Sequence, residues 1–275
     1  PNGAGKTTTI KMLTGLLAPT SGTGRVAGHD VVSERHAIKS VIGYMSQRFS
    51  LYPDLTVAEN IELFAGLYGV QGMRLRERRE WILDMAGLEG KAHEVTGDLP
   101  LGWKQRLALG CAVVHEPPIL FLDEPTSGVD PLARRRFWDL IDGLAARGTT
   151  VFVSTHYMEE AEYCHRLALM NRGRIIALDA PGALRGSVDL VILEVRTDDP
   201  PGAVEALRSA PGITDAAMFG RRLHVVVEDE ERGRVRVREV LASAGHEARA
   251  VAPIRPSLED VFVALIRREG GAPVA

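Results

Sequence analysis

The run PNGAGKTT at the start of the sequence constrains the fold more than any other feature. It matches the pattern G-x-x-x-x-G-K-[ST] from the second position of that pattern onward. Small residues in such a run let backbone N–H groups converge on a triphosphate, because a Cβ would block the approach. The lysine adds a charge that reaches the β- and γ-phosphates, and the next hydroxyl binds Mg²⁺. The residues predicted to hold the triphosphate are Asn2, Gly3, Ala4, Gly5, Lys6, Thr7 and Thr8.

The pattern also predicts what should precede the run. Its first glycine would stand immediately before Pro1, with a strand ahead of it. We therefore expect the sequence to be an N-terminally truncated fragment, or the later part of a longer polypeptide. The alternative interpretation is an ordinary glycine-rich turn that opens a helix. Apolar residues at helical spacing predict that helix over 6–17, which favours a phosphate-binding loop.

Short apolar runs alternate with helical patterns in the first two thirds of the chain. Strands are expected at 41–45, 119–122 and 149–154, with a crossover helix at 132–146. A strand, a helix and a strand at this spacing form a βαβ unit, which implies a parallel sheet. The fold class predicted is therefore α/β, a P-loop NTPase fold with a parallel sheet.

Three further regions complete the predicted organisation. Helical patterns between about Arg48 and Gly110 predict a helical subdomain within a first domain over residues 1–186. Residues 187–268 show the order strand, helix, strand, strand, helix, strand and a closing helix, which predicts a small α+β domain of the ferredoxin-like kind. Residues 269–275 are predicted to be a tail.

Polar residues follow the predicted strands. Asp123 ends a buried apolar run, where a carboxylate could hold hydrated Mg²⁺, and Glu124 beside it could polarise a water molecule aimed at the γ-phosphate. His156 and Gln47 also follow strands. Each residue alone would be an ordinary loop residue, and their joint order along the chain carries the prediction.

In that order the sequence resembles the ATP-binding subunits of ABC transporters over nearly its whole length. PNGAGKTTT resembles the Walker A loop, ILFLDEP the Walker B strand and LPLGWKQRL the family signature. The resemblance implies catalytic roles for Glu124 and His156, and Mg²⁺ binding by Thr7, Gln47 and Asp123. It also implies a D-loop with Ser127 and Asp130, and docking of a transmembrane partner by Phe49, Leu51 and Tyr52. The last three could instead simply pack the helical subdomain.

The signature departs from the family pattern. Pro100 and Leu101 stand where the family has serine and its first glycine, and Gly102, Lys104 and Gln105 follow. In the family this segment contacts the γ-phosphate bound to a second subunit, so two sites form only in a head-to-tail dimer. Proline is acceptable at a helix start, and the helix N-terminus still favours phosphate. The hydroxyl contact is lost, so the site completed by this signature is expected to hydrolyse ATP poorly.

The implied function is that of the ATP-hydrolysing motor of an ABC exporter, resembling bacterial drug- and antibiotic-export ATPases and one half of tandem export ATPases. Its partners would be a transmembrane permease and a second ATPase domain, in a homodimer, a heterodimer or a tandem protein. Its ligands would be ATP and Mg²⁺. The alternatives are a soluble ABC ATPase acting on ribosomes or DNA, and a regulatory subunit that does not hydrolyse ATP.

Composition bears on these alternatives. The 275 residues carry a formal charge of −3, so no global positive field predicts a nucleic-acid partner. No run of eighteen apolar residues occurs, and the two cysteines lack zinc or disulfide spacing. We expect a cytoplasmic protein that lies at the inner face of the cell membrane through its partner.

Overall fold

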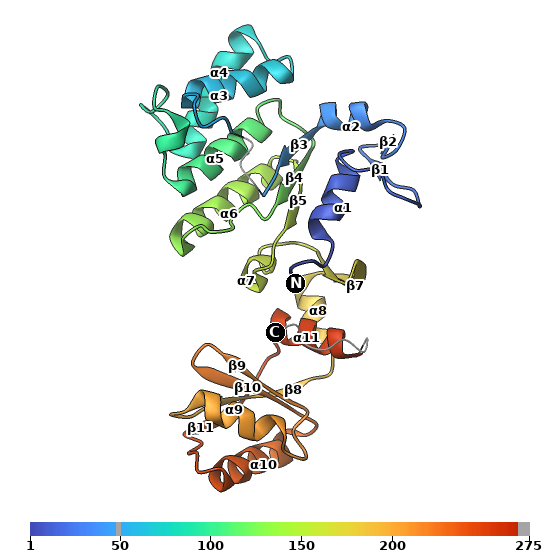
Figure 1. The fold of residues 1–275 in the computed structure, drawn as a ribbon, viewed down its shortest axis with the longest axis vertical. Coiled ribbons are helices and arrows are strands. Elements are labelled where there is room, and N and C mark those ends of the chain that lie inside the picture. Colours follow the sequence, from blue (N-terminus) through green and yellow to red (C-terminus); the bar gives the residue numbers. More distant parts are fainter. Residues whose placement is uncertain (48–50, 269–275) are drawn as a thin grey trace. The chain divides into compact units, whose positions relative to one another are not determined.

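The computed structural model describes residues 1–47 and 51–268 (Figure 1). It divides into two compact units, one formed by residues 1–163 and 172–174, the other by residues 164–171 and those from 175 onward. This division does not coincide with the predicted boundary at 186/187, which stays a prediction.

A parallel sheet forms the centre of the first unit. Its strands are β3 (Ile42–Met45), β4 (Ile119–Asp123) and β5 (Thr150–Ser154), in the order β3-β4-β5. All neighbours are parallel, which confirms the predicted α/β class. Four of the five residues of β4 are buried, as expected for a strand that is covered on both faces.

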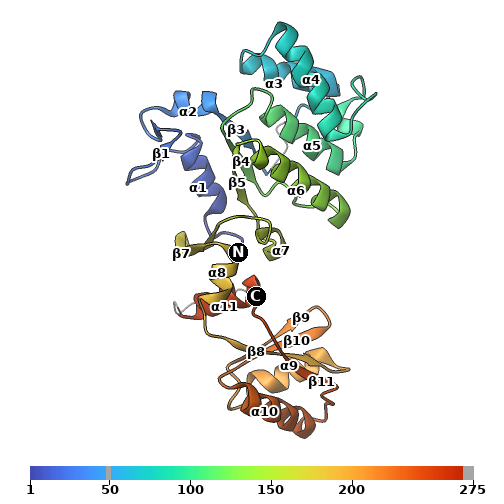
Figure 2. The same ribbon diagram turned by 180° about the vertical axis from the view of Figure 1, so that it is seen from behind.

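Helices lie on both sides of this sheet. The helix α1 (Lys6–Leu13) lies on one side and α6 (Pro131–Ala146) on the other, and views from the front and from behind agree (Figures 1 and 2). The predicted helix over 6–17 is too long, because Gly15 has a φ of 69° and the chain leaves the helix there. The small sheet of β1 (Arg25–Val26) and β2 (His29–Asp30) precedes α2 (Arg35–Val41).

The predicted helical subdomain contains α3 (Val57–Leu67), α4 (Gly72–Ala86), the short η1 (Thr96–Asp98) and α5 (Leu101–Ala112). A capping box starts α3, in which Thr56 and Glu59 satisfy each other's backbone N–H groups. Gly110 lets α5 approach α4 closely, because a Cβ at this position would lie 2.4 Å from Ile82. Local capping and one tight helix crossing thus build the subdomain.

Between β5 and the C-terminal elements the chain forms α7 (Met158–Ala161), the antiparallel pair β6 (Leu167–Asn171) and β7 (Arg174–Asp179), and α8 (Pro181–Gly186).

Across residues 1–47 and 51–268, no helix is both long and apolar enough to cross a membrane.

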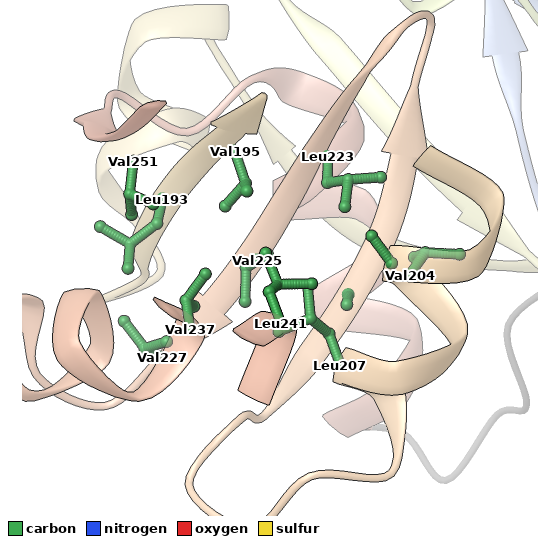
Figure 3. Close-up of a cluster of buried hydrophobic side chains, with 12 residues drawn as sticks. Leu193, Val195, Val204, Leu207, Leu223, Val225, Val227, Val237, Leu241 and Val251 are labelled. Carbon is green, nitrogen blue, oxygen red and sulfur yellow. The ribbon is translucent and has the colours of Figure 1, made fainter. Parts of the chain in front are cut away.

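The C-terminal elements are β8 (Val191–Arg196), α9 (Pro200–Arg208), β9 (Asp215–Phe219), β10 (Arg222–Val227), α10 (Glu230–Ser243), β11 (Ala250–Ile254) and α11 (Leu258–Arg268). The sheet order β11-β8-β10-β9 with antiparallel neighbours is the βαββαβ arrangement predicted. Its core joins one face of the sheet to α9 and α10, with Leu193, Leu207, Val225 and Leu241 fully buried (Figure 3).

Candidate functional site

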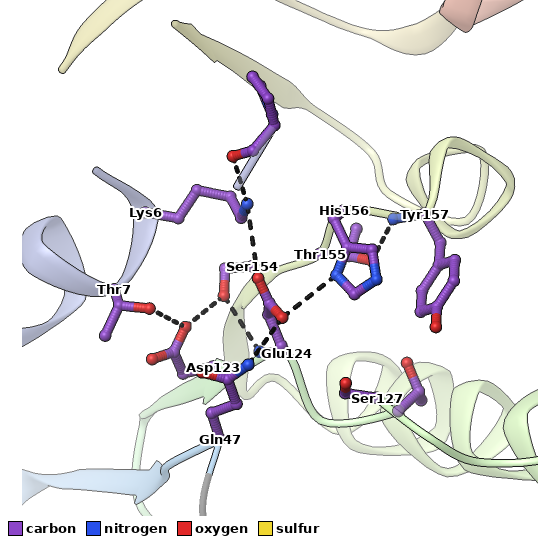
Figure 4. A network of polar contacts seen from close by, with 12 residues as sticks. Lys6, Thr7, Gln47, Asp123, Glu124, Ser127, Ser154, Thr155, His156 and Tyr157 are labelled. Carbon is purple, nitrogen blue, oxygen red and sulfur yellow. Dashed lines mark hydrogen bonds and ion pairs between the residues drawn. The ribbon is translucent and has the colours of Figure 1, made fainter. Parts of the chain in front are cut away.

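The candidate site lies where the parallel strands end. Asp123 is the last residue of β4 and pairs in register with Ser154, the last residue of β5. Gln47 follows the neighbouring strand β3 by two residues. Carboxyl ends of parallel strands meet at one edge of a sheet, and ligands bind there in open α/β folds. Figure 4 shows these side chains converging with Lys6, Thr7 and His156.

The glycine-rich loop has the geometry of a phosphate cradle. Gly3 and Gly5 have φ values of 73° and 101°, in the region that favours glycine. Gly5 is the N-cap of α1 and offers no side chain, so no cap competes for the N–H groups of the first turn. Nothing lies within 4 Å of a Cβ built on Gly3. Uncapped N–H groups at a helix N-terminus form an anion site.

Asp123 offers a carboxylate oxygen that could bind a divalent cation. Its side chain is 1% exposed, and its Oδ1 accepts from Thr7 Oγ1 at 3.1 Å and Ser154 Oγ at 2.6 Å. Its Oδ2 is buried and has no hydrogen-bond partner. A buried carboxylate oxygen without a partner is costly, and a cation would satisfy it. Thr7 and Asp123 therefore fit Mg²⁺, which keeps several waters and takes few protein ligands.

Tyr44 is a further titratable neighbour of Asp123. Burial, together with the nearby Asp123 carboxylate, raises the pKa of Tyr44, so the phenol stays neutral. Within the described ranges, no group of three or more His, Cys, Asp and Glu side chains could hold a metal.

Glu124 sits at the centre of a polar network. Its side chain is 9% exposed and its φ is 49°, an unusual value for a residue with a Cβ. Oε2 accepts from Gln47 Nε2 at 3.0 Å and faces His156 Nδ1 at 3.1 Å, while Oε1 lies 3.4 Å from Lys6 Nζ. The backbone N–H of Glu124 donates to Ser154 O at 3.0 Å. In this structure the Gln47 amide donates to Glu124. Its predicted role in binding Mg²⁺ stays a prediction.

Lys6 and His156 lie near different oxygens of the same Glu124 carboxylate. Lys6 Nζ also donates to Pro1 O at 3.0 Å, which places the ammonium beside the loop. The His156 ring lies 4.1 Å from the ring of Tyr157, between centroids. The predicted Lys6, Thr7, Gln47, Asp123, Glu124 and His156 thus come together, and Ser154 joins them. No signal in the sequence indicated the role of Ser154, which follows from the strand register that pairs it with Asp123.

The signature residues divide into two kinds. Pro100 is the N-cap of α5 without a side-chain cap bond, and Leu101 is 38% exposed. Lys104 Nζ donates to Gly97 O at 2.6 Å. Gln105 is 5% exposed, and its Nε2 lies 3.5 Å from Ser127 O. In this structure Lys104 and Gln105 therefore contact backbone carbonyl groups of their own chain.

The remaining predicted residues that the structure describes differ in their surroundings. Asp130 is the N-cap of α6, where its carboxylate accepts from Leu132 N at 3.1 Å and Ala133 N at 3.0 Å. Leu51 is 8% exposed, which favours the alternative that it packs within its subdomain, and its docking role stays a prediction. Tyr52 is 55% exposed. Phe49 lies outside the described residues.

Comparisons with known proteins show similarity to the ATP-binding proteins of ABC transporters. A family model described as ABC transporter matches residues 1–127, and one described as AAA domain, putative AbiEii toxin, Type IV TA system matches residues 104–160. The chain is 51% identical over 185 residues to the probable multidrug ABC transporter ATP-binding protein YbhF of Escherichia coli (strain K12). That match covers 67% of this chain, and the chain spans only 32% of the length of YbhF.

Two further similarities extend the comparison. The Nod factor export ATP-binding protein I of Paraburkholderia xenovorans (strain LB400) is 38% identical over 271 residues, covering 98% of this chain and 86% of that protein. The structure titled "Dimeric structure of a post-hydrolysis state of the ATP-binding cassette MJ0796 bound to ADP and Pi" is 28% identical with a TM-score of 0.60. The match covers 66% of the present chain and 82% of the chain in that structure.

A phosphate cradle before α1 and an acidic pair at the end of the neighbouring parallel strand define a P-loop nucleotide-binding domain. The predicted P-loop NTPase fold is thereby confirmed. The chain belongs to the ABC transporter family, in which it is an ABC ATPase domain.

Proposed function

We propose that this chain is the motor of an ABC exporter, which couples Mg-ATP hydrolysis at a head-to-tail dimer interface to export by a membrane partner. The observation that carries the hydrolytic part is the Glu124 carboxylate, held by Lys6, Gln47 and His156 at the end of β4. The export role is supported by the similarity to YbhF, named a probable multidrug ABC transporter ATP-binding protein, and to the Nod factor export ATP-binding protein I.

The chain's own groups divide the chemistry between them. The N–H groups of the loop and the Lys6 ammonium would bind the β- and γ-phosphates and offset their charge. Glu124 would accept a hydrogen bond from the attacking water and orient it in line with the γ-phosphate. His156, beside Glu124, would contact the γ-phosphate and sense its loss. Mg²⁺, held by Thr7 and Asp123, would supply charge neutralisation at the phosphate oxygens.

Hydrolysis requires a rearrangement of the contacts seen around Glu124. Lys6 Nζ is 3.4 Å from Glu124 Oε1, so the two side chains form an ion pair. Phosphates in the loop would compete for this ammonium, which would release the carboxylate toward water. Binding of ATP would thereby free the Glu124 carboxylate to act as the base.

Partner and location follow from the same proposal. A second ATPase domain would complete the site with its own signature, in a homodimer, a heterodimer or a tandem protein. A transmembrane permease would hold the domain at the inner face of the membrane. The ATPase core over 1–186 would bind nucleotide, and the domain over 187–268 would be accessory.

The altered signature gives a direct prediction. Pro100→Ser together with Leu101→Gly is expected to raise the turnover of a homodimer about tenfold, equivalent to about 1.4 kcal/mol. The serine hydroxyl would donate to the γ-phosphate, and the glycine would clear the side chain that is 38% exposed at the start of α5. Steady-state ATPase rate and melting temperature would be measured on the full-length protein.

Its matched control is Pro100→Ala with Leu101→Gly, which clears the same space but adds no hydroxyl. An equal rate for the serine and alanine variants would exclude the hydroxyl as the cause. Rates equal to the unmodified protein, with a lower melting temperature, would show that the native signature is not impaired. That result would mean that proline already prepares the first turn of α5.

Docking of the permease is tested at Tyr52, the predicted docking residue that is 55% exposed. Tyr52→Asp should release the protein from membranes that contain the co-expressed partner, because a charge would be desolvated in an apolar contact. Leu67→Asp, at a position 71% exposed on α3, is the control. Membrane recovery of the Tyr52 variant equal to that of the unmodified protein would place docking elsewhere.

The regulatory alternative is favoured by Pro100 alone, and the same ATPase measurement separates it. A regulatory subunit would bind ATP but show no turnover even with a partner domain that has an intact signature. The alternative that acts on ribosomes or DNA lacks a supporting observation among the described residues.

A further inference from the structure

Glu160 is a buried carboxylate that the proposed chemistry does not use. It lies in α7 and is 1% exposed. Its Oε1 accepts a hydrogen bond from Thr126 Oγ1, and its Oε2 accepts one from Thr155 Oγ1 at 2.6 Å. Arg134 Nε lies 3.4 Å from Oε1 and supplies the opposite charge. A buried carboxylate needs such partners, because burying it without them would be very costly.

The two threonines belong to the two loops that carry the catalytic candidates. Thr126 follows Glu124 by two residues, and Thr155 immediately precedes His156. Each carboxylate oxygen of Glu160 therefore binds one of the two loops. Thr155 Oγ1 also accepts a hydrogen bond from Tyr157 N at 3.0 Å. The hydroxyl of the residue before His156 therefore binds the backbone of the residue after it.

A second line of contacts leads from Glu160 to the imidazole itself. The Arg134 guanidinium, paired with Glu160, lies 4.0 Å from the centroid of the Tyr157 ring. The Tyr157 ring in turn lies 4.1 Å from the His156 ring. One carboxylate thus supports both the loop that holds His156 and the aromatic ring beside it.

We infer that Glu160 is a positioning residue for ATP hydrolysis, which sets the Glu124 loop against the His156 loop by binding Thr126 and Thr155 at the same time. This inference rests on the proposed function, in which Glu124 and His156 act on the attacking water and the γ-phosphate. The observed 3.1 Å contact between His156 Nδ1 and Glu124 Oε2 is the geometry that the bridge maintains. Loss of the bridge would misplace His156 without removing any group that binds ATP.

The test compares kcat and KM for ATP in the full-length protein with its ATPase partner domain. Glu160→Ala removes the bridge, and Thr126→Val and Thr155→Val each cut one arm of it with little change in shape. Each variant is expected to lower kcat about tenfold or more and to leave KM within about twofold. Glu160→Gln, which keeps an acceptor, should restore part of the kcat lost in the alanine variant. Glu159→Ala is the control, because Glu159 is exposed on the same helix.

Double variants show whether the effect passes through His156. Glu160→Ala in a His156→Ala background should lower kcat by less than twofold further, because the group that it positions is already absent. Melting temperatures identify unfolding, and the threonine variants keep the test decisive should Glu160→Ala fail to fold. The inference is overturned by unchanged kcat in the threonine variants, or by a full additional loss in the His156→Ala background.

Failure of the proposed function gives a different result. Glu124→Gln and His156→Ala are measured in the same assay, and normal turnover in both would overturn the catalytic assignment and the positioning role with it. Slow turnover in both, with normal turnover in the threonine variants, would overturn the positioning role alone.

Discussion

Replacing Glu124 with glutamine is expected to slow ATP hydrolysis by about 10²-fold or more while ATP still binds, the scale expected for general-base catalysis. Glutamine keeps the shape of the side chain and can still accept from the Gln47 amide, which lies 3.0 Å from the carboxylate. It loses the negative charge that would draw a proton from water. With the chemical step blocked, the ATP-bound dimer should accumulate, and size-exclusion chromatography with ATP would detect it.

Glu116 offers a matched control for this change. It shares the left-handed backbone of Glu124, with φ values of 59° and 49°, and its side chain is 54% exposed. Glu116→Gln removes only surface ion pairs with Arg74 and Arg78, which are worth little. Turnover of the Glu124 variant near that of this control would show that another residue orients the water.

Replacing Lys6 with alanine should abolish detectable ATP binding. Lys6 supplies the only side-chain charge of the loop run PNGAGKTT, and charge-assisted hydrogen bonds contribute about 1.5–3 kcal/mol each. Contacts to two phosphates would then be worth a factor of about 10² to 10⁴ in affinity. The variant also leaves Glu124 without the ammonium that lies 3.4 Å away. Calorimetric titration with Mg-ATP gives the affinity, and thermal unfolding reports any loss of stability.

Lys11→Ala is the control for the lysine variant, because Lys11 lies exposed in the last turn of the same helix. Its affinity for Mg-ATP should equal that of the unmodified protein. An equal affinity in the Lys6 variant as well would contradict the assignment of residues 2–8 as the phosphate-binding loop.

Much of the fold was predictable because its signals are local. Apolar runs that end at Asp123 and at Ser154 predicted two buried strands, and both strands were found within a residue of their expected bounds. The burial was predicted correctly for β4 but wrongly for β5, in which only Ser154 is buried and Phe152 is exposed. The C-terminal order of elements was also predicted correctly. The length of α1 was not, since Leu16 and Leu17 continue its apolar pattern while Gly15 turns the chain out of the helix.

Roles that depend on distant partners were harder to predict. Leu51 was predicted either to dock a partner or to pack its subdomain, because an apolar side chain beside a polar loop suits either place, and its burial favours packing. Lys104 and Gln105 contact Gly97 and Ser127 of the same chain, and their role toward a second subunit stays a prediction. Glu160 carried no signal at all, because a glutamate near the start of a short helix is usually solvated.

The sequence by itself determined the chemistry of the site, because the run from Gly3 to Thr7 and the pair Asp123-Glu124 contain their residue types at fixed local spacing. Only the tertiary structure decided how these groups meet. Parallel register places Ser154 beside Asp123, and the fold brings Lys6, Gln47 and His156 to one carboxylate. Such contacts join residues far apart in the sequence, 116 positions in the case of Thr7 and Asp123, and depend on strand pairing that local spacing does not encode.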